Sequence, residues 1–322
     1  MKIISIVTAC YNEEENVETL YQQVKKIFQE NLKYYEYEHI FIDNASQDAT
    51  VPILKRIANV DHNVKIIVNS RNFGHIRSPH YGLLQASGDA VISIVADLQD
   101  PPNLIPEFVK KWEEGFKIVV GIKKQSDESS LFFLIRKIYY KIVTKLADIE
   151  LIGNYTGFGL YDKRVIEILR NIPDAYPYFR GLICDIGFEK AMIEYRQPER
   201  KRGITKNNFY TLFDMAMLGI TTHSKVPLRL ASILGFGTAI FSMLAAFVYF
   251  VYKILLWDNF QVGQAPLVIG LFFFSSVQLI FIGIIGEYVG NIYTQVLKRP
   301  LVIEKERINF KAEDQIQGKE IL

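Results

Sequence analysis

The chain has 322 residues, of which 49% are hydrophobic and 22% charged, and its formal net charge is +2. A charge this close to zero excludes a broadly basic surface, so we expect no nucleic acid among its partners. Its two cysteines, Cys10 and Cys184, show neither a disulfide framework nor metal-ligand spacing, which is typical of a protein in a reducing compartment.

The first 125 or so residues alternate short apolar runs with amphipathic segments, the pattern of βαβ units around a parallel sheet. We expect strands at Ile3–Thr8, His39–Asp43, Val64–Val68, Ala90–Val95 and Ile118–Gly121. We expect helices at Glu14–Phe28, Ala49–Ile57, His75–Ala86 and Leu104–Glu114. The first strand pattern begins almost at the first residue, without the longer apolar core and cleavage site of a signal peptide. The sequence therefore predicts an α/β domain.

Polar residues follow the first two expected strands, where Tyr11 lies in the first loop and Asp43 opens the second. The carboxyl ends of parallel strands meet at one edge of an open α/β sheet, and ligands bind there. Asp43 could accept hydrogen bonds from a ribose or base, and Tyr11 could stack on a nucleotide. The alternative is helix capping, for which Asn12, Ser46 and Asp48 are good candidates.

The loop after the third expected strand brings a cation, Arg71, to the same edge. The apolar run Val91–Val95 then ends in a string that contains Asp97 and Gln99 and stops at a Pro-Pro pair. Carboxylate and amide oxygens in this place suit Mg²⁺ or Mn²⁺, and such an ion suits a diphosphate. The alternative is a plain surface turn, since Asp and Pro are common turn residues.

Two later segments are amphipathic, at about 131–146 and 206–222. Each has an apolar stripe at helical spacing, and the first also carries a basic face, so we expect both to lie at a membrane surface. Ordinary packing against the rest of the chain is the alternative.

Two uncharged stretches, Leu230–Tyr252 and Val262–Gly286, are each long enough to cross a bilayer, which needs about 20 residues. The alternative is a buried helical hairpin. Basic residues flank the pair on the outside, at Lys225, Arg229, Lys298 and Arg299. The short connection between the stretches carries little charge, so the positive-inside rule places both termini in the cytoplasm.

Taken together, these motifs resemble the inverting glycosyltransferases of family 2, which have the GT-A fold. The resemblance is to the polyprenyl-phosphate sugar transferases, the group of dolichol-phosphate mannose synthase and the bacterial undecaprenyl-phosphate glucosyltransferases. It rests on the strings Tyr11–Glu14, Asp43–Asp48, Ser70–Gly74, Gly88–Asp89 and Ala96–Pro102. It continues through Gly203–Lys206 and the two uncharged stretches to Gly286–Tyr288 and Arg299–Pro300, and so covers nearly the whole chain.

The resemblance implies a domain organisation in four parts. Residues 1–205 would form a cytoplasmic GT-A catalytic domain that includes the interfacial helix at about 131–146. A juxtamembrane amphipathic helix would follow at 206–226, a two-helix transmembrane anchor at 228–290, and a cytoplasmic tail at 291–322.

The resemblance also implies the residues of the site. Residues expected to bind the nucleotide-sugar are Ala9, Tyr11, Glu13, Asp43, Arg71 and Asp97. Asp97 and Gln99 would hold Mg²⁺ or Mn²⁺. Residues expected to bind the acceptor phosphate are Lys123, Arg136, Arg200 and Lys206. Asp97, Arg136 and Arg200 are expected to be catalytic.

The chain departs from the family pattern at two positions. Val95 stands where the metal motif usually begins with an aspartate, so the site has one negative charge fewer. Gly157 stands where many relatives carry an aspartate viewed as catalytic, so no general base is assigned. A lipid phosphate is already an anion near neutral pH and needs positioning more than a base, and we expect Asp162 to be structural.

We expect an enzyme that moves one sugar, from a UDP-sugar by preference, to a polyprenyl phosphate such as undecaprenyl phosphate, with inversion. It would act at the cytoplasmic face of the bacterial inner membrane, with the lipid bilayer as a partner and a homo-oligomer left open. A non-catalytic nucleotide-sugar-binding scaffold is one alternative, supported by Val95 and Gly157. A polysaccharide synthase is a weaker one, because neither Trp112 nor Trp257 lies in the Gln-x-x-Arg-Trp motif of that class.

Overall fold

The structure is a computed structural model that describes residues 1–124, 152–198, 217–219, 221–222, 224–255 and 264–310. A mixed sheet with the strand order β7-β5-β6-β4-β1-β2-β3-β8 forms the centre of the N-terminal domain. Its strands are β1 (Lys2–Cys10), β2 (Tyr35–Asp43), β3 (Val64–Asn69), β4 (Ala90–Val95), β5 (Ile118–Lys123), β6 (Tyr155–Asp162), β7 (Lys190–Tyr195) and β8 (Glu304–Ile308).

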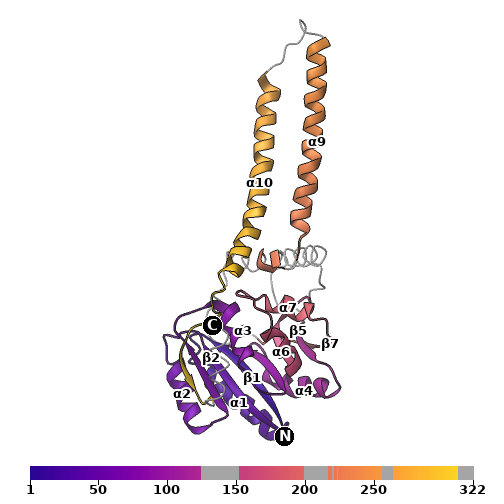
Figure 1. The fold of residues 1–322 in the computed structure, drawn as a ribbon. Coiled ribbons are helices and arrows are strands. Elements are labelled where there is room, and N and C mark those ends of the chain that lie inside the picture. The colour runs from indigo at the N-terminus through magenta and orange to yellow at the C-terminus, as the bar shows by residue number, and fades with distance from the viewer. Residues whose placement is uncertain (125–151, 199–216, 220, 223, 256–263, 311–322) are drawn as a thin grey trace.

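Helices cover both faces of this sheet. The helices of the domain are α1 (Val17–Glu30), α2 (Thr50–Val60), α3 (Gly74–Leu84), α4 (Ile105–Glu113), α6 (Lys163–Arg170) and α7 (Phe179–Asp185), with a short 3-10 turn at Pro102–Leu104. Two long helices, α9 (Val226–Leu255) and α10 (Gln264–Val296), extend side by side away from the domain (Figure 1).

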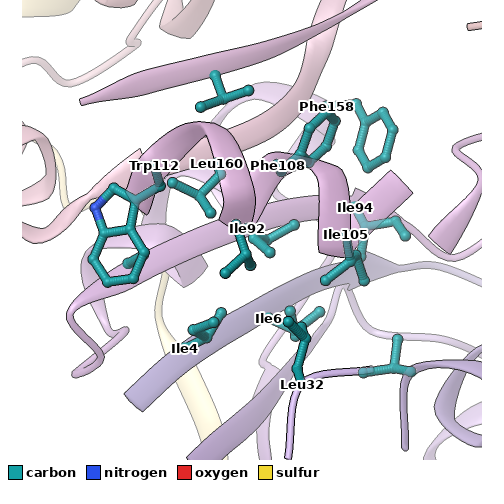
Figure 2. Close-up of a cluster of buried hydrophobic side chains, with 14 of the residues drawn as sticks. Ile4, Ile6, Leu32, Ile92, Ile94, Ile105, Phe108, Trp112, Phe158 and Leu160 are labelled. Atoms are coloured by element: carbon teal, nitrogen blue, oxygen red, sulfur yellow. The ribbon is translucent and has the colours of Figure 1, made fainter. Parts of the chain in front are cut away.

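The central strands are largely apolar because both faces of the sheet are buried. On β1, Ile4 and Ile6 pack with α1 and α4 on one face (Figure 2), and Val7 packs with α3 on the other. The parallel block β4-β1-β2-β3 therefore aligns its carboxyl ends at one edge, with Ala9 opposite Val95 and Cys10 opposite Asp43. Cys10 and Cys184 are both buried free thiols, as their core-like contexts suggested.

All five expected strands and all four expected helices of the first 125 residues are present. The expectation of a simple parallel sheet was incomplete, because β6 runs antiparallel between β4 and β5. Residues beyond position 150 form β6, β7 and β8, and the local sequence pattern did not predict these three strands. Helix α1 begins at Val17, three residues later than expected, because a turn that includes Asn12 at φ 55° precedes it.

The C-terminal segment returns to the sheet. Helix α10 continues to Val296, and β8 then pairs antiparallel with β3, with Ile66 opposite Ile308. Residues 304–308, which the sequence analysis assigned to a tail, are thus part of the catalytic sheet. An added strand of this kind leaves no free edge on β3.

Helices α9 and α10 are candidate membrane spans by length and composition, over Val226–Leu255 and Leu267–Val296. Their apolar windows are not buried within the structure, unlike those of a core helix in a soluble protein. At 1.5 Å per residue, 30 residues extend about 45 Å, which exceeds the roughly 30 Å of a hydrocarbon core. The expected interfacial helix at about 131–146 lies outside the described residues, as does 206–216 of the juxtamembrane segment.

Candidate active site

Three adjacent strand ends carry the loops that the sequence analysis selected. Each loop contains one non-glycine residue in the left-handed region, namely Asn12 at φ 55°, Ala45 at φ 64° and Leu98 at φ 59°. Such a conformation costs roughly 1–2 kcal/mol for an L-residue and persists only where its surroundings hold it. Strained backbone of this kind concentrates at functional sites.

The loops after β1 and β2 are tied together by reciprocal hydrogen bonds. The Asn12 backbone N–H donates to Ser46 Oγ at 2.9 Å, and the Gln47 N–H donates to Asn12 Oδ1 at 2.8 Å. The Glu13 N–H donates to Thr50 Oγ1 at 2.9 Å. Asn12 and Ser46 therefore join the loops after β1 and β2, which differs from the helix-capping alternative.

Asp43 lies at the end of β2 and is fully buried. Its carboxylate accepts a hydrogen bond from the Ser46 backbone N–H at 3.0 Å and another from the Ser46 hydroxyl. Burial raises the pKa of Asp43 above its ordinary value, although the hydrogen bonds from Ser46 act in the opposite direction. In this state a ribose or base could reach the carboxylate only by sharing or displacing the bonds from Ser46.

The other residues predicted to bind the nucleotide lie around the same edge. Ala9, Tyr11 and Glu13 are half-buried at and after the end of β1. Arg71 is exposed and its guanidinium lies 4.0 Å from the centre of the Phe73 ring. The structure thus brings these four residues, together with Asp43, to the carboxyl edge of the β1-β2-β3 strands, with Arg71 as an accessible cation.

Asn44 has a positioning role that the sequence analysis did not assign. Its side-chain oxygen accepts hydrogen bonds from the Phe73 backbone N–H at 2.9 Å and from Asn69 Nδ2 at 3.2 Å. Its amide nitrogen donates to Asn72 Oδ1 at 2.8 Å and to the Gly74 carbonyl at 3.1 Å. Asn44 is buried and joins the loop after β2 to the loop after β3. Only the three-dimensional proximity of the two loops reveals this role.

Asp100 holds the turn that follows β4. It is buried and accepts hydrogen bonds from Tyr195 Oη at 3.0 Å and from the Val95 backbone N–H at 3.4 Å. Desolvation raises the pKa of Asp100 to about 6, and the Asp97 carboxylate also raises it. Asp97 itself is half-buried, and its Oδ1 accepts from the Gln99 N–H at 3.1 Å. Because Asp100 is occupied, Asp97 and Gln99 are the side chains of this turn left to meet a ligand.

A divalent cation would find few protein ligands here. Asp97 and Gln99 offer hard oxygens, while the neighbouring Val95, which is 43% exposed, offers none. Within the described part of the chain, no group of three or more His, Cys, Asp or Glu side chains is placed to hold a metal. Mg²⁺ is often bound through one or two carboxylates together with substrate phosphates and water. The donor set therefore fits an ion that arrives with a diphosphate, and fits a permanently held ion poorly.

Lys123 is the one residue predicted to bind the acceptor phosphate that the structure describes. It ends β5 opposite Tyr195 of β7, and its charge acts on Asp100 by lowering the pKa of that carboxyl. Lys123 therefore lies near the turn that carries Asp97. The other three such residues, Arg136, Arg200 and Lys206, lie outside the described residues.

Gly157 lies on β6 at φ 107°, in the region that favours glycine. Its carbonyl accepts a hydrogen bond from Tyr161 Oη at 2.7 Å, which holds the backbone in this conformation. Asp162 accepts from Trp112 Nε1 at 2.7 Å and caps α6 through the Arg164 N–H at 3.0 Å. These contacts support the structural role expected for Asp162.

Comparison with known proteins gives concordant results. The family model "Glycosyl transferase family 2" matches residues 5–170. The "SfII prophage-derived bactoprenol glucosyl transferase" of Shigella flexneri is 37% identical over 306 residues, covering 94% of this chain and 97% of the relative. The "Uncharacterized glycosyltransferase YkcC" of Bacillus subtilis is 35% identical over 300 residues, covering 93% and 92%. Among solved structures, a more distant match is glucosyl-3-phosphoglycerate synthase from Mycobacterium tuberculosis, in complex with Mn²⁺, UDP-glucose and phosphoglyceric acid. The TM-score is 0.48 and the sequence identity is 19%. The match covers 69% of this chain and 78% of the solved chain.

Proposed function

This chain belongs to glycosyl transferase family 2 and is a glycosyltransferase with the GT-A fold, and from that premise we propose that it transfers a single sugar from a nucleotide-sugar to a polyprenyl phosphate. One observation carries the proposal. The same chain that holds the Asp97 turn at the carboxyl edge of a parallel sheet continues into two long apolar helices. The first feature suits a sugar diphosphate and the second suits an acceptor that resides in a bilayer. The relatives named as bactoprenol glucosyl transferases support the same acceptor class.

The proposed donor is a UDP-sugar, and the proposed acceptor is undecaprenyl phosphate. As the sugar leaves its diphosphate, negative charge develops on the leaving oxygen. Mg²⁺ or Mn²⁺, held by Asp97 and Gln99, would neutralise part of this charge when bound. Arg71, which is exposed beside the crevice, supplies a further positive charge from the protein.

The acceptor phosphate oxygen forms a bond to the anomeric carbon as the bond to the diphosphate breaks, on the opposite face of the sugar, so the configuration inverts. An anionic phosphate needs no base to remove a proton before it attacks. This agrees with Gly157, which stands where many relatives carry an aspartate. Lys123, with Arg136, Arg200 and Lys206 as predicted partners, would orient this phosphate and offset its charge. Arg136 and Arg200 would be catalytic because they would contact the attacking phosphate.

The proposed location is the cytoplasmic face of the bacterial inner membrane. Lys225, Arg229, Lys298 and Arg299 lie at the ends of α9 and α10 next to the catalytic domain. Because basic residues concentrate on the cytoplasmic side, the catalytic domain would face the cytoplasm, where nucleotide-sugars are available.

Transfer of radiolabelled sugar to extractable lipid tests the proposal. Membranes that contain the full chain would be supplied with undecaprenyl phosphate and a panel of UDP-, GDP- and CDP-sugars. We expect lipid-soluble label with a UDP-sugar, and a loss of roughly 100-fold or more for Asp97→Asn, since charge stabilisation at the leaving group carries much of catalysis. Glu36→Gln is the control, because Glu36 is exposed at the opposite edge of the sheet.

The other functions predict different outcomes. Binding of nucleotide-sugar without any transfer would support the scaffold function, for which Val95 and Gly157 are the specific observations. Label in an insoluble polymer, with none in lipid, would indicate a polysaccharide synthase.

A further inference from the structure

A polar cavity of about 410 Å³ lies where the end of α10 meets the catalytic domain. It is separate from the Asp97 turn and involves none of the residues assigned above. Its walls come from α3, the segment before α7, the described residues 217–219 and 221, and α10. The lining residues used below are Arg77, Tyr176, Leu218, Thr221, Gly290 and Asn291.

The cavity lies at the boundary of the apolar part of α10. This helix has 33 residues and extends about 50 Å, roughly 20 Å more than a hydrocarbon core. Glu287, another lining residue, is the first charged residue after the uncharged stretch that ends at Gly286. Beyond it, α10 is attached to the domain, since Tyr288 Oη donates to the Ser224 carbonyl at 2.6 Å and Gln295 Nε2 donates to Asp174 Oδ1 at 2.7 Å. A bilayer around α9 and α10 would place the domain-side end of α10 at headgroup level (Figure 1), and the cavity is lined by residues of that end.

The chemistry of the cavity is that of a site for an anionic oxygen. Arg77 Nε is buried and has no hydrogen-bond partner within the described residues. Its guanidinium lies 5.4 Å from the centre of the Tyr176 ring, a contact that gives Nε no acceptor. A buried donor left without an acceptor is unfavourable, so a ligand that supplies oxygens would stabilise this arrangement. Arginine is the residue best suited to phosphate, which it binds through two parallel hydrogen bonds.

The remaining walls indicate a phosphate that is attached to a lipid. Among the described residues, the contacts of Asn291 Nδ2 are long, at 3.4 Å to Thr221 Oγ1 and 3.5 Å to Thr222 Oγ1, so it can reorient toward a ligand. Leu218 is buried and lines the apolar side of the cavity. Glu287 is exposed and also lines the cavity, so its carboxylate opposes any anion that binds there and Arg77 has to offset this repulsion. A lipid phosphate arrives along the membrane side, where α10 is apolar.

We propose that this cavity binds the phosphate of a membrane lipid through Arg77, with Asn291 as a second donor. Two lipids share this chemistry, a polyprenyl phosphate waiting to enter the active site and an ordinary anionic phospholipid. The proposal requires that α9 and α10 lie in a bilayer, as in the proposed function, but it requires no transfer of sugar.

The test is lipid binding by the purified full chain in detergent, measured by native mass spectrometry. The probes are undecaprenyl phosphate, phosphatidylglycerol, diacylglycerol as a lipid without phosphate, and inorganic phosphate. We expect the first or the first two to bind. Arg77→Gln should weaken that binding by about tenfold or more, because a charge-assisted hydrogen bond is lost. Arg77→Lys should retain part of it.

A second variant and a control variant test the cavity without relying on Arg77 alone. A Cβ atom at Gly290 would meet no atom within 4 Å, so Gly290→Leu can fill space in the cavity without a clash at that atom, and it should also reduce binding. Arg229→Gln is the matched control, since Arg229 is exposed at the start of α9 and does not line the cavity. Thermal unfolding of each variant checks that it is folded.

Unchanged lipid binding in both Arg77→Gln and Gly290→Leu would overturn the proposal. Equal binding of diacylglycerol would also overturn it, as would binding of inorganic phosphate as tight as that of the lipids. Binding of undecaprenyl phosphate alone would identify the acceptor as the ligand, and binding of both phosphate lipids would identify a general lipid site. Since no donor is present, a failed transfer assay would leave this measurement unaffected.

Discussion

At the scale of single residues, the candidate active site presents little negative charge on the turn after β4. Asp97 is its one available carboxylate on the turn after β4, because Asp100 is buried against Tyr195. Val95 is exposed beside it, opposite Ala9 across the strand pair. In the proposed metal site, the side chain at position 95 therefore sets how many carboxylates the protein itself can offer a divalent ion.

Replacement of Val95 by aspartate should strengthen metal binding. The position is 43% exposed, so a carboxylate can be placed there without being fully desolvated. We expect Val95→Asp to lower the Mg²⁺ concentration that gives half-maximal transfer by roughly tenfold, because metal affinity rises with the number of charged ligands. Titration of the initial rate with Mg²⁺ measures this. Met192→Asp, which is exposed on β7, is the control, and an unchanged Mg²⁺ requirement for Val95→Asp would contradict the assignment.

Two substitutions at Gly157 test whether the reaction proceeds without a general base. Because it lies at φ 107°, both Gly157→Ala and Gly157→Asp should lower the free energy of unfolding by about 1–2 kcal/mol. The alanine variant carries the same backbone strain without a carboxylate. We expect the turnover of the aspartate variant to be no higher than that of the alanine variant. An aspartate variant many times faster than the wild type would show that the natural site is impaired.

At the scale of elements, the loops and the last strand matter more than the helices that join them. The loops after β1, β2 and β3 are joined by hydrogen bonds of Asn12, Ser46 and Asn44, so each depends on its neighbour for its conformation. The strand β8 plays the same part at the far edge of the sheet. There Arg307 donates to Glu304 at 2.6 Å and to Gln85 Oε1 at 2.7 Å.

Loss of the Arg307 side chain should destabilise the catalytic domain. The Arg307 side chain is only 10% exposed, and its removal leaves Glu304 without its ion-pair partner. We expect Arg307→Met to lower the free energy of unfolding by about 2–4 kcal/mol, as for other partly buried pairs broken on one side. Denaturant unfolding of the full chain in detergent measures it. Lys305→Met, an exposed change on the same strand, should have little effect, and equal losses for both variants would argue against the role of Arg307.

At the scale of the whole molecule, the chain enters and leaves the helix pair on the same side. Helix α9 starts and α10 ends next to the catalytic domain, and β8 then fastens the C-terminal segment to the sheet (Figure 1). The catalytic domain is therefore connected to both ends of the proposed membrane anchor, which limits how far the domain can move from the lipid surface.

The orientation of the helix pair can be measured with introduced cysteines. Native Cys10 and Cys184 are buried, so the background of labelling should be low. In right-side-out spheroplasts, we expect an impermeant maleimide to label Lys253→Cys at the outer end of α9. Arg299→Cys, which follows α10, should react only after lysis, since the catalytic domain is proposed to be cytoplasmic. The reverse pattern would contradict the proposed orientation.

The sequence by itself determined the βαβ order, the two long apolar helices and the family, because these depend on local periodicity, on uninterrupted apolar length and on short motifs such as Asp97–Pro102. The tertiary structure decided the antiparallel insertion of β6, the return of β8, and the roles of Asn44 and Asp100. It also revealed the cavity at Arg77, whose walls come from four separate segments. The reason is physical: hydrogen bonds and cavities between distant segments arise only after the chain has packed, and no local pattern of residues encodes which segments will meet.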